Sequence, residues 1–383
     1  MFWILSLLLI CFILGGDAVK KCGGKLAVIL GVWSLLWISC IVLPAKEKSF
    51  SERRILKQFP QVTTQSLASG GFMQSFEEYA LDQFPFRDAF RALNSVSALY
   101  VFRQKDNQGF YLADGYIGKL DQRVNYNSLT NAIKKFQYIQ ETYLKDNNVY
   151  FSIVPDKGYF LAEENGYPGM DYDALVNTMT EGMPYAEYID IMGELEIFSY
   201  YKTDTHWRQE ELLDVAEVLG RKMGAFDKKN AVYEKKIGTK EFYGVYYGQL
   251  ALPVKAEPLY YLTNDVLDRC YTVLADLEAE SNGSVYDLSK LDGNDPYEMF
   301  LSGAVPILTL VNPENDRGRE LILFRDSFGS SIAPLLVEGY SKITLIDIRY
   351  VNSQMLGELV EFKGKDVLFL YSTLLLNSSF TFK

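Results

Sequence analysis

The chain has 383 residues, of which 48% are hydrophobic and 14% aromatic, and its formal net charge is −11. A chain of this length and hydrophobicity can bury the core of one large domain or of two modest ones. The acidic balance argues against nucleic acid as a partner, because basic side chains are needed to displace counterions from phosphates. The 27 Tyr and 24 Phe suit strand faces and sugar-stacking surfaces, and we expect packing to use most of them.

Two apolar runs open the chain. Residues 1–16 are almost wholly apolar, and Leu26 to Leu43 form a second run interrupted only by Gly, Ser and Cys. The second run has the length of a transmembrane helix, whereas the first is short for one. Three lysines lie between them, so the positive-inside rule places everything after Pro44 outside the cell. A cleavable signal peptide is the alternative, but the sequence after Leu43 is a poor cleavage site.

We therefore expect a protein of the cell membrane, held by a single-pass or hairpin anchor, with an extracellular main domain. The first run is either a short extra span or a result of start-site choice. Residues 46–383 carry 35 basic and 48 acidic side chains, which predicts an acidic external part.

The cysteines and the single histidine limit disulfides and metal sites. Cys11, Cys22 and Cys40 lie in or beside the apolar runs, which leaves Cys270 alone outside. We expect no disulfide within the external part. One histidine and one cysteine cannot build a zinc site of His and Cys ligands, so only an all-oxygen metal site stays open. We expect no cofactor and no metal.

Residues 46–120 read as a stalk and lead-in region just outside the membrane. A short helical signal covers residues 51–57. Apolar side chains between Phe72 and Ala80 follow helical spacing, and that helix should stop at Phe84-Pro85. A second helix is expected over residues 86–102. The Asp-Gly pair inside residues 109–118 predicts a β-hairpin.

Residues 121–383 are expected to form an α/β domain. A helix over 127–144, a strand over 149–154, a strand over 187–191 and a helix over 210–223 alternate along the chain. A βαβαβ run follows, with strands at 305–311, 320–324, 342–347 and 366–371 and helices at 328–338 and 352–362. This alternation predicts a mostly parallel sheet flanked by helices.

Residues 225–298 break this rhythm. The segment is rich in Tyr and Lys and reads as irregular strands and loops. It is either a substrate-contacting flap over the sheet edge or a plain structural elaboration. The domain prediction is thus an anchor over 1–45, the lead-in over 46–120 and the α/β domain over 121–383 with this insertion.

The only histidine of the chain, His206, follows Asp204 by two positions and directly precedes Trp207. Histidine is the side chain whose ordinary pKa suits a general base near neutrality, and an acid beside it can orient the imidazole. The alternative is a lone surface or core histidine. Because the chain has one histidine, only His206 can serve as the base of a Ser-His pair.

Ser327 follows the apolar run Leu321 to Phe324 and opens a predicted helix. Ligands of open α/β sheets bind beyond the carboxyl ends of the strands, where a helix start offers free N–H groups. A serine at such a turn exposes its hydroxyl and aims its own N–H at an oxyanion. The alternative is an Asp/Ser cap of the following helix.

These two motifs carry a resemblance. Thr-Asp-Thr-His-Trp at 203–207 followed by Asp-Ser-Phe-Gly at 326–329 resembles the DHHW family of Gram-positive membrane-anchored proteins. It also resembles the SGNH-like domain of the alginate O-acetyltransferases, where similar signatures come in the same order. Further landmarks are Ser51-Glu-Arg-Arg, Asp82 to Asp88, Asp114-Gly-Tyr116, Val154-Pro-Asp-Lys157 and Ile346 to Tyr350, so the resemblance covers nearly everything after Pro44.

The resemblance implies an SGNH-hydrolase-like fold with Ser327 as nucleophile, His206 as general base and then acid, and Asp204 as the residue that orients it. Two departures are visible. The family tetrad is Asp-Thr-His-Trp here, which is the acetyltransferase form. Arg325 replaces the glycine that precedes Asp-Ser, and we expect it to crowd or charge the turn.

Three further residues are candidate substrate-binding residues. Arg349 follows a strand at the same rim as Ser327 and would contact a carboxylate or hydroxyl of a polysaccharide, and Tyr350 stands beside it. A salt bridge of Arg349 to Asp347 or another acid is the alternative. Trp207 would stack on a sugar, or else pack the loop and fix His206.

Three functions compete at this point. The first is a membrane-anchored extracellular O-acetyltransferase or acetyl esterase that acts on a cell-envelope or secreted polysaccharide through an acetyl-serine intermediate. By resemblance, its partner is a polytopic membrane O-acyltransferase. The second is a non-catalytic glycan-binding or assembly protein that keeps the fold, and the third is an anchored structural protein of the envelope.

Overall fold

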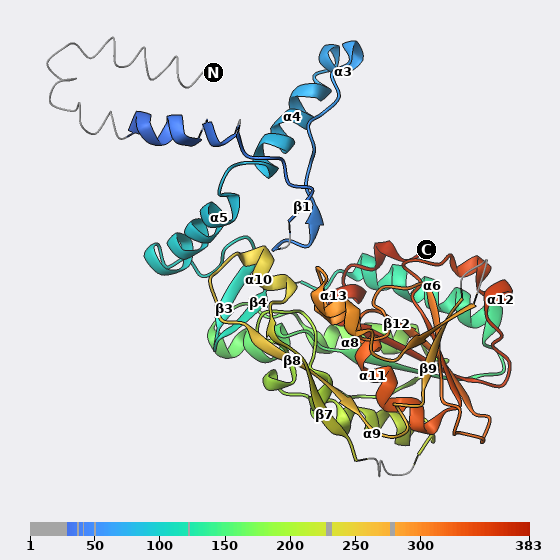
Figure 1. Cartoon of the computed structure of the whole chain (residues 1–383). Coiled ribbons are helices and arrows are strands. Elements are labelled where there is room, and N and C mark those ends of the chain that lie inside the picture. The colour runs from blue at the N-terminus through green and yellow to red at the C-terminus, as the bar shows by residue number, and fades with distance from the viewer. Residues whose placement is uncertain are drawn as a thin grey trace, which may run out of the picture. The chain divides into compact units, whose positions relative to one another are not determined.

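A computed structural model describes residues 29–36, 38–40, 42–49, 51–121, 123–226, 232–275 and 280–383. The chain divides into two compact units, residues 1–93 and 94–383 (Figure 1). The first apolar run, Cys11 and Cys22 lie outside the described residues.

An eight-stranded sheet forms the centre of the second unit. Its spatial order is β10 (Glu280–Ser284), β9 (Tyr271–Ala275), β11 (Ile307–Val311), β13 (Lys342–Ile346), β12 (Glu320–Arg325), β14 (Asp366–Ser372), β5 (Asn148–Val154) and β6 (Glu187–Tyr188). The pairings from β13 to β6 are parallel, and those from β10 to β13 are antiparallel. The predicted mostly parallel sheet is confirmed, with an antiparallel extension at one side.

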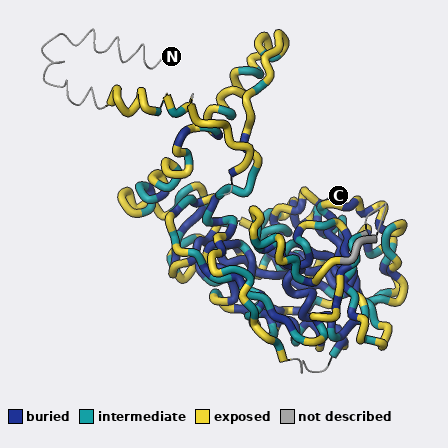
Figure 2. The backbone as a smooth tube through the Cα atoms, viewed as in Figure 1, coloured by how far each residue is buried: buried dark blue, intermediate teal, exposed yellow. Residues whose placement is uncertain are grey.

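Alternate residues of the inner strands point to opposite faces of the sheet. On β12, Leu321 and Leu323 belong to one apolar cluster, whereas Ile322 and Phe324 belong to another. This period of two is what a strand buried on both faces requires. Figure 2 shows buried residues gathered in the interior of the second unit and exposed residues at its outside.

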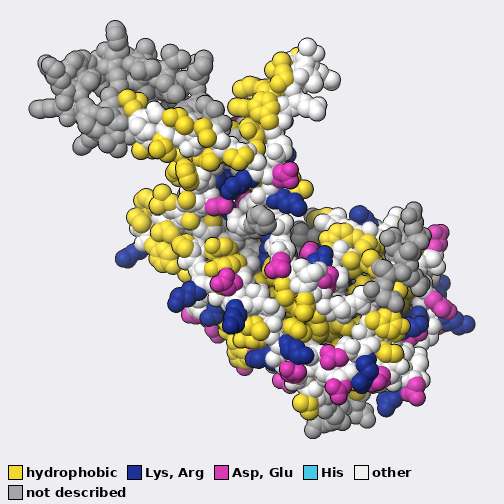
Figure 3. Space-filling view, viewed as in Figure 1, with side chains coloured by type: hydrophobic (Ala, Val, Ile, Leu, Met, Phe, Trp, Pro, Cys, Tyr) yellow, Lys and Arg dark blue, Asp and Glu magenta, His cyan; other side chains and the backbone are white. Residues whose placement is uncertain are grey.

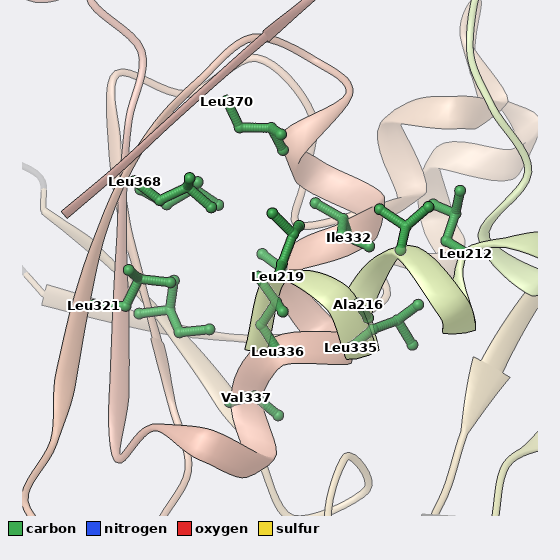
Figure 4. Packing of buried hydrophobic residues seen from close by; sticks show 14 of the residues in the cluster. Leu212, Ala216, Leu219, Leu321, Ile332, Leu335, Leu336, Val337, Leu368 and Leu370 are labelled. Atoms are coloured by element: carbon green, nitrogen blue, oxygen red, sulfur yellow. The ribbon is translucent and has the colours of Figure 1, made fainter. Parts of the chain in front are cut away.

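Helices cover both faces of the sheet. Apolar residues of α9 (Leu213–Lys222) and α11 (Gly329–Leu336) pack against one face, as Figure 4 shows for Leu219 and Leu336 beside Leu321 and Leu368. On the other face lie α6 (Tyr126–Tyr143), α8 (Tyr172–Gly182) and α12 (Leu356–Leu359). The predicted α/β architecture with flanking helices is therefore present.

The two long helices of the second face begin at capping residues. The side chain of Asn125 accepts the N–H of Ser128, and that of Asp171 accepts the N–H of Ala174. Each cap satisfies an N–H group that has no partner inside the helix. Short helices complete the unit: α7 (Gly158–Leu161), α10 (Val245–Leu250) and α13 (Thr373–Leu376).

The second unit also contains two-stranded sheets apart from the main sheet. β3 (Phe110–Ala113) and β4 (Tyr116–Lys119) form the hairpin predicted from the Asp-Gly pair. β7 (Glu234–Phe242) pairs with β8 (Glu257–Thr263). The expected break over residues 225–298 is only partial, because β9 and β10 from this segment extend the main sheet. Residues 227–231 and 276–279 of the segment lie outside the described part.

Several predicted elements are shorter or different. The strand expected over 187–191 is the two-residue β6, and the helix expected over 352–362 is reduced to a turn and α12. The helix predicted over 51–57 is wrong. The segment contains β2 (Arg54–Ile55), which pairs with β1 (Lys48–Ser49), and Arg53 between them has a left-handed φ of 53° that no α-helix contains.

The first unit also contains α3 (Thr64–Ala68), α4 (Gly71–Asp82) and the start of α5 (Arg87–Val96). The last two are the helices predicted in the lead-in region. Residues 29–36, 38–40 and 42 of the second apolar run are helical. Within the part of the chain that the structure describes, no helix meets the length and hydropathy that a membrane crossing needs.

Candidate active site

Ser327 lies in the turn that joins β12 to α11, at the carboxyl end of an interior strand. The carboxylate of Asp326 holds this turn. Its Oδ1 accepts the N–H of Phe328 at 3.0 Å, and its Oδ2 accepts the N–H and the hydroxyl of Ser372 at 2.9 and 2.7 Å. Because Ser372 ends the neighbouring strand β14, the serine turn is tied to the edge of the sheet.

Asp204 and His206 lie in a loop, residues 200–207, whose ends pair with each other. Tyr200 and Trp207 form an antiparallel bridge, and the N–H of Tyr201 donates to the carbonyl of His206 at 3.1 Å. The closed loop brings the two candidate residues together. Oδ1 of Asp204 accepts the N–H of His206 at 3.0 Å and lies 2.5 Å from its Nδ1.

The other ring nitrogen of His206 faces the serine. Nε2 lies 2.7 Å from Oγ of Ser327, although the two residues are 121 positions apart. Oδ2 of Asp204 accepts the N–H of Val245 at 2.7 Å, and Asp204 is fully buried. With an ionised Asp204, the proton of the imidazole resides on Nδ1, and Nε2 is free to accept the serine proton. The three side chains thus form one hydrogen-bonded chain suited to general-base activation of a hydroxyl. Their catalytic roles stay a prediction.

Aromatic rings fix the plane of the imidazole. The ring of Tyr297 stacks on that of His206, with centroids 3.9 Å apart and planes 7° apart, and Phe328 lies at 5.0 Å. The hydroxyl of Tyr297 donates to Oγ of Ser331 at 2.8 Å, which ties this ring to α11. Burial raises the pKa of Tyr297 well above its ordinary value, so the phenol remains neutral.

Lys157 supports the same loop from below. It is 2% exposed, and its Nζ donates to the carbonyls of Tyr201 and Lys202 at 3.0 and 3.2 Å. Nζ also lies 4.9 Å from the ring centroid of Tyr246. Burial lowers the pKa of Lys157 to about 7, although the negative charge of Asp204 opposes this shift. Lys157 therefore fixes the backbone that leads into Asp204.

A second support comes from the segment 225–298. Oε1 of Glu257 accepts the N–H and the hydroxyl of Thr203 at 3.0 and 3.1 Å, and Oγ1 of Thr203 accepts the N–H of Gly244 at 2.9 Å. The backbone at Gly244 passes so close to Asp204 that an added Cβ would lie 2.3 Å from its Cα. Part of this segment therefore packs around the candidate acid.

Contrary to the prediction, Arg325 does not crowd the serine turn. Its side chain is 1% exposed, with Nη1 3.8 Å from Oδ2 of Asp347 and Nη2 donating to the carbonyl of Gly303 at 3.1 Å. The room comes from Gly329, where an added Cβ would lie 2.5 Å from Cβ of Arg325. Gly329, two residues after Ser327, thus leaves room for Arg325, which stands where the resemblance led us to expect a glycine.

Arg349 forms the salt bridge that was the alternative to substrate binding. Its Nε and Nη2 lie 2.8 and 2.5 Å from the two oxygens of Asp347. Its guanidinium also lies 5.3 Å from the ring centroid of Tyr350, which is 46% exposed. Tyr350 is therefore accessible, whereas the charge of Arg349 is already paired. Binding of a substrate by either residue stays a prediction.

Trp207 is corrected from a substrate-binding residue to a packing residue. It is fully buried, so neither face of its ring is open to a sugar. Its Nε1 donates to Oγ of Ser331 at 2.8 Å and to the carbonyl of Phe328 at 3.2 Å. Because Trp207 directly follows His206, these bonds attach the histidine loop to the helix that follows the serine.

Within the described ranges, no group of three or more His, Cys, Asp or Glu side chains could hold a metal ion. The hydrogen-bonded chain from Asp204 to Ser327 needs only the side chains present to move a proton.

The structure thus combines an α/β sheet with a serine at a strand end and an Asp-His pair beside it. Solved structures share this fold. A DHHW family protein from Eubacterium siraeum matches with a TM-score of 0.56 at 19% identity, over 71% of this chain and 93% of its own. PatB1 of Bacillus cereus matches with a TM-score of 0.56 at 18% identity, over 70% of this chain and 96% of its own.

A second structure of PatB1, with a sulfonyl adduct, matches with a TM-score of 0.55 at 16% identity, over 70% of this chain and 95% of its own. No protein-family model and no curated protein matches. The matches to solved structures confirm the resemblance inferred from the two motifs at the level of the fold.

Several residues that support the site have little or no signal in the sequence. Lys157 belongs to the landmark motif Val154-Pro-Asp-Lys157, and a lysine three residues after the end of a buried strand was the available signal. Tyr297, Gly244 and Glu257 had none, because their contacts arise only when residues 225–298 fold back over the loop.

Proposed function

We propose that the chain is a serine acyltransferase or esterase that forms an acyl ester on Ser327. The observation that carries the proposal is the hydrogen-bonded chain from Asp204 through His206 to Ser327, with contacts of 2.5 and 2.7 Å. A cap or a core histidine would not need both ring nitrogens of His206 to face these two groups.

In the proposed reaction, Nε2 of His206 takes the proton of Ser327 as Oγ attacks the acyl carbonyl. The tetrahedral intermediate then expels the leaving group, which receives this proton, and the acyl group remains on Oγ. In the second half, His206 deprotonates an acceptor hydroxyl or a water, which attacks the ester carbonyl. As the bond to Oγ breaks, the imidazolium gives this proton to Oγ and restores the hydroxyl of Ser327. Asp204 stabilises the imidazolium that forms in each half.

The negative oxygen of the intermediate needs hydrogen-bond donors. Among the described residues, the N–H of Ser327 has no acceptor, and it is the backbone donor next to the attacking oxygen. Asp326 fixes the direction of this N–H because both of its oxygens hold the turn.

The acyl group is proposed to be acetyl, and the acceptor a hydroxyl of a cell-envelope or secreted polysaccharide. The support is the resemblance of residues 203–207 and 326–329 to the motifs of the alginate O-acetyltransferases. The exposed Tyr350, whose hydroxyl and ring suit a sugar, stands three residues after Asp347, which directly follows β13.

We further propose that the second apolar run anchors the chain in the cell membrane with the second unit outside. The support is the length of the run and the three lysines before it. Retention in membranes after an alkaline carbonate wash, together with cleavage by protease added to intact cells, is the expected result. Protection from external protease in intact cells would contradict the orientation.

Turnover of p-nitrophenyl acetate by the purified full chain tests the proposed chemistry. We expect Ser327→Ala and His206→Ala to reduce kcat by about 10⁴-fold or more, because each removes a partner of a unit that works together. Ser330→Ala, one helical turn further on, is the matched serine control and should leave kcat near that of the wild type.

A sulfonyl fluoride provides a second readout. A structure of PatB1, which has this fold, contains a sulfonyl adduct, so such a reagent is a suitable probe. We expect one adduct per chain by mass spectrometry, located at Ser327. Equal turnover by wild type, Ser327→Ala and His206→Ala would refute the proposal and leave the non-catalytic glycan-binding function in its place.

A further inference from the structure

The first unit exposes large apolar side chains that a water-soluble surface rarely gathers. Between residues 59 and 93 they are Phe59, Val62, Leu67, Met73, Phe76, Leu81, Phe84, Phe86, Phe90 and Leu93. Figure 3 shows hydrophobic side chains gathered over α4 and α5. A group of this size marks a surface that contacts something other than water.

The start of α5 shows how this surface is organised. Phe90 and Leu93 lie on one helical stripe of α5, and Phe86 stands directly before the helix, with a φ of 58°, at the matching i, i+4, i+7 spacing. Phe86, Phe90 and Leu93 are 57, 45 and 60% exposed. The opposite side of the helix carries Arg87 and Arg91. This is the pattern of a helix that lies flat at a boundary between water and an apolar phase.

Protein contacts are already made by the polar side. Arg87 pairs with Glu52 in the β1–β2 hairpin, and Nη2 of Arg91 lies 3.7 Å from the same carboxylate. The hydroxyl of Ser51 donates to Asp88 at 3.1 Å. These contacts fix α5 against the hairpin by its polar side, and the apolar stripe of α5 therefore points outward.

The junction of α4 and α5 is held at the end of the second apolar run. Gln83 follows α4, and its Oε1 accepts the N–H of Lys46 at 2.8 Å. Its Nε2 donates to the carbonyls of Lys46 and Lys57 at 2.8 and 3.0 Å. Lys46 comes three residues after Leu43, where that run ends. A cavity of about 900 Å³ is lined by Leu43 and Pro44 together with Phe84 and Phe86.

We propose that the stripe Phe86, Phe90 and Leu93 lies in the headgroup region of the lipid bilayer that the second apolar run enters. The inference rests on the proposed anchor, because the hydrogen bonds of Gln83 then keep the start of α5 at the level where the chain leaves the membrane. The stripe would keep the first unit flat on the membrane.

Site-directed spin labelling of the full chain in vesicles of phosphatidylcholine and phosphatidylglycerol tests this proposal. In a background in which the four cysteines are replaced by serine, labels are attached at Phe86→Cys, Phe90→Cys and Leu93→Cys. Asp88→Cys, on the polar side of the same helix, is the matched control. Oxygen concentrates in lipid, whereas a charged nickel complex stays in water.

We expect the three stripe labels to collide more often with oxygen and less often with the nickel complex than the label at position 88. Equal exposure of all four labels to the nickel complex would overturn the proposal. Protection of the stripe labels from both reagents would also overturn it, because a protein surface would then cover the stripe.

Failure of the anchor is distinguished by a separate measurement. A chain that leaves the vesicles in an alkaline carbonate wash lacks the anchor, and the proposal falls with it. A retained chain with water-exposed stripe labels keeps the anchor and refutes only the stripe. Because the labelled positions are exposed, an unchanged circular dichroism spectrum is expected for each variant and shows that it is folded.

Discussion

Gly244→Ala should damage the candidate site without altering any member of the hydrogen-bonded chain. A Cβ at this position would lie 2.3 Å from both Cα and Cβ of Asp204 and 2.4 Å from its N. Two of these atoms belong to the backbone and cannot rotate away, so Asp204 must move by roughly 1 Å to restore a normal carbon contact. Asp204 holds the imidazole of His206, and the displacement therefore reaches the bond to Ser327.

Two magnitudes follow from this displacement. Overpacking of a tight site costs about 1–3 kcal/mol of stability. A displacement of this size in a catalytic group lowers the rate on the order of 10²-fold. We therefore expect kcat for p-nitrophenyl acetate to fall by about 10²-fold with little change in KM, while the protein remains folded in urea titrations.

Gly193→Ala is the matched control for this experiment. An added Cβ at Gly193 meets nothing within 4 Å, so kcat and stability should stay close to those of the wild type. A folded Gly244→Ala protein with wild-type kcat would show that the position of Asp204 does not limit the reaction, and the steric argument would then be wrong.

Three other changes probe the supports of the site. The pKa of Lys157 is about 7 in the folded state and 10.5 in the unfolded state, so the unfolded state binds more protons between these values. The unfolding free energy should therefore rise by a few kcal/mol from pH 7 to 10.5. Lys157→Met should abolish this rise in urea titrations. Tyr297→Phe keeps the ring stacked on His206 and should lower the unfolding free energy by about 1 kcal/mol with kcat preserved. Tyr297→Ala should lower kcat at least tenfold. Equal kcat values for the two variants would show that the ring does not position His206. Trp207→Phe removes the N–H that bonds Ser331 and should lower the unfolding free energy by about 1–3 kcal/mol in urea titrations, and a value near zero would refute the structural role of that N–H.

Local sequence patterns predicted the inner strands, one hairpin and three of the helices. Continuous apolar runs such as Leu321 to Phe324 gave the inner strands, because a strand covered on both faces has no polar alternation. The Asp-Gly pair at 114–115 gave the hairpin, and apolar spacing gave α4, α6 and α9. The short helical signal at 51–57 failed because its charged side chains instead bond other elements, as Arg54 does with Asp82 at 2.7 Å.

The nearness of His206 and Ser327 was predicted from chemistry and from a resemblance, since no pattern connects residues so far apart. What could not be predicted was the surroundings of the site. The sequence left Trp207 open between a sugar platform and a packing residue, because its burial depends on Ser331 and Phe328, more than a hundred residues away. Arg325 looked like an obstacle because the space left by Gly329 exists only after the helix packs.

The loop that carries Asp204 and His206 has a consequence for how the site fails. Because the ends of the loop pair at Tyr200 and Trp207, Asp204 and His206 lie in one short closed loop. A disturbance of this loop carries both residues along and leaves their mutual contact intact. The loop is attached to the start of α11 by the bonds of Trp207, but only the contact between the imidazole and the hydroxyl of Ser327 can pass the proton. Damage from a distance should therefore appear first as a less readily deprotonated nucleophile rather than as a wrongly oriented histidine.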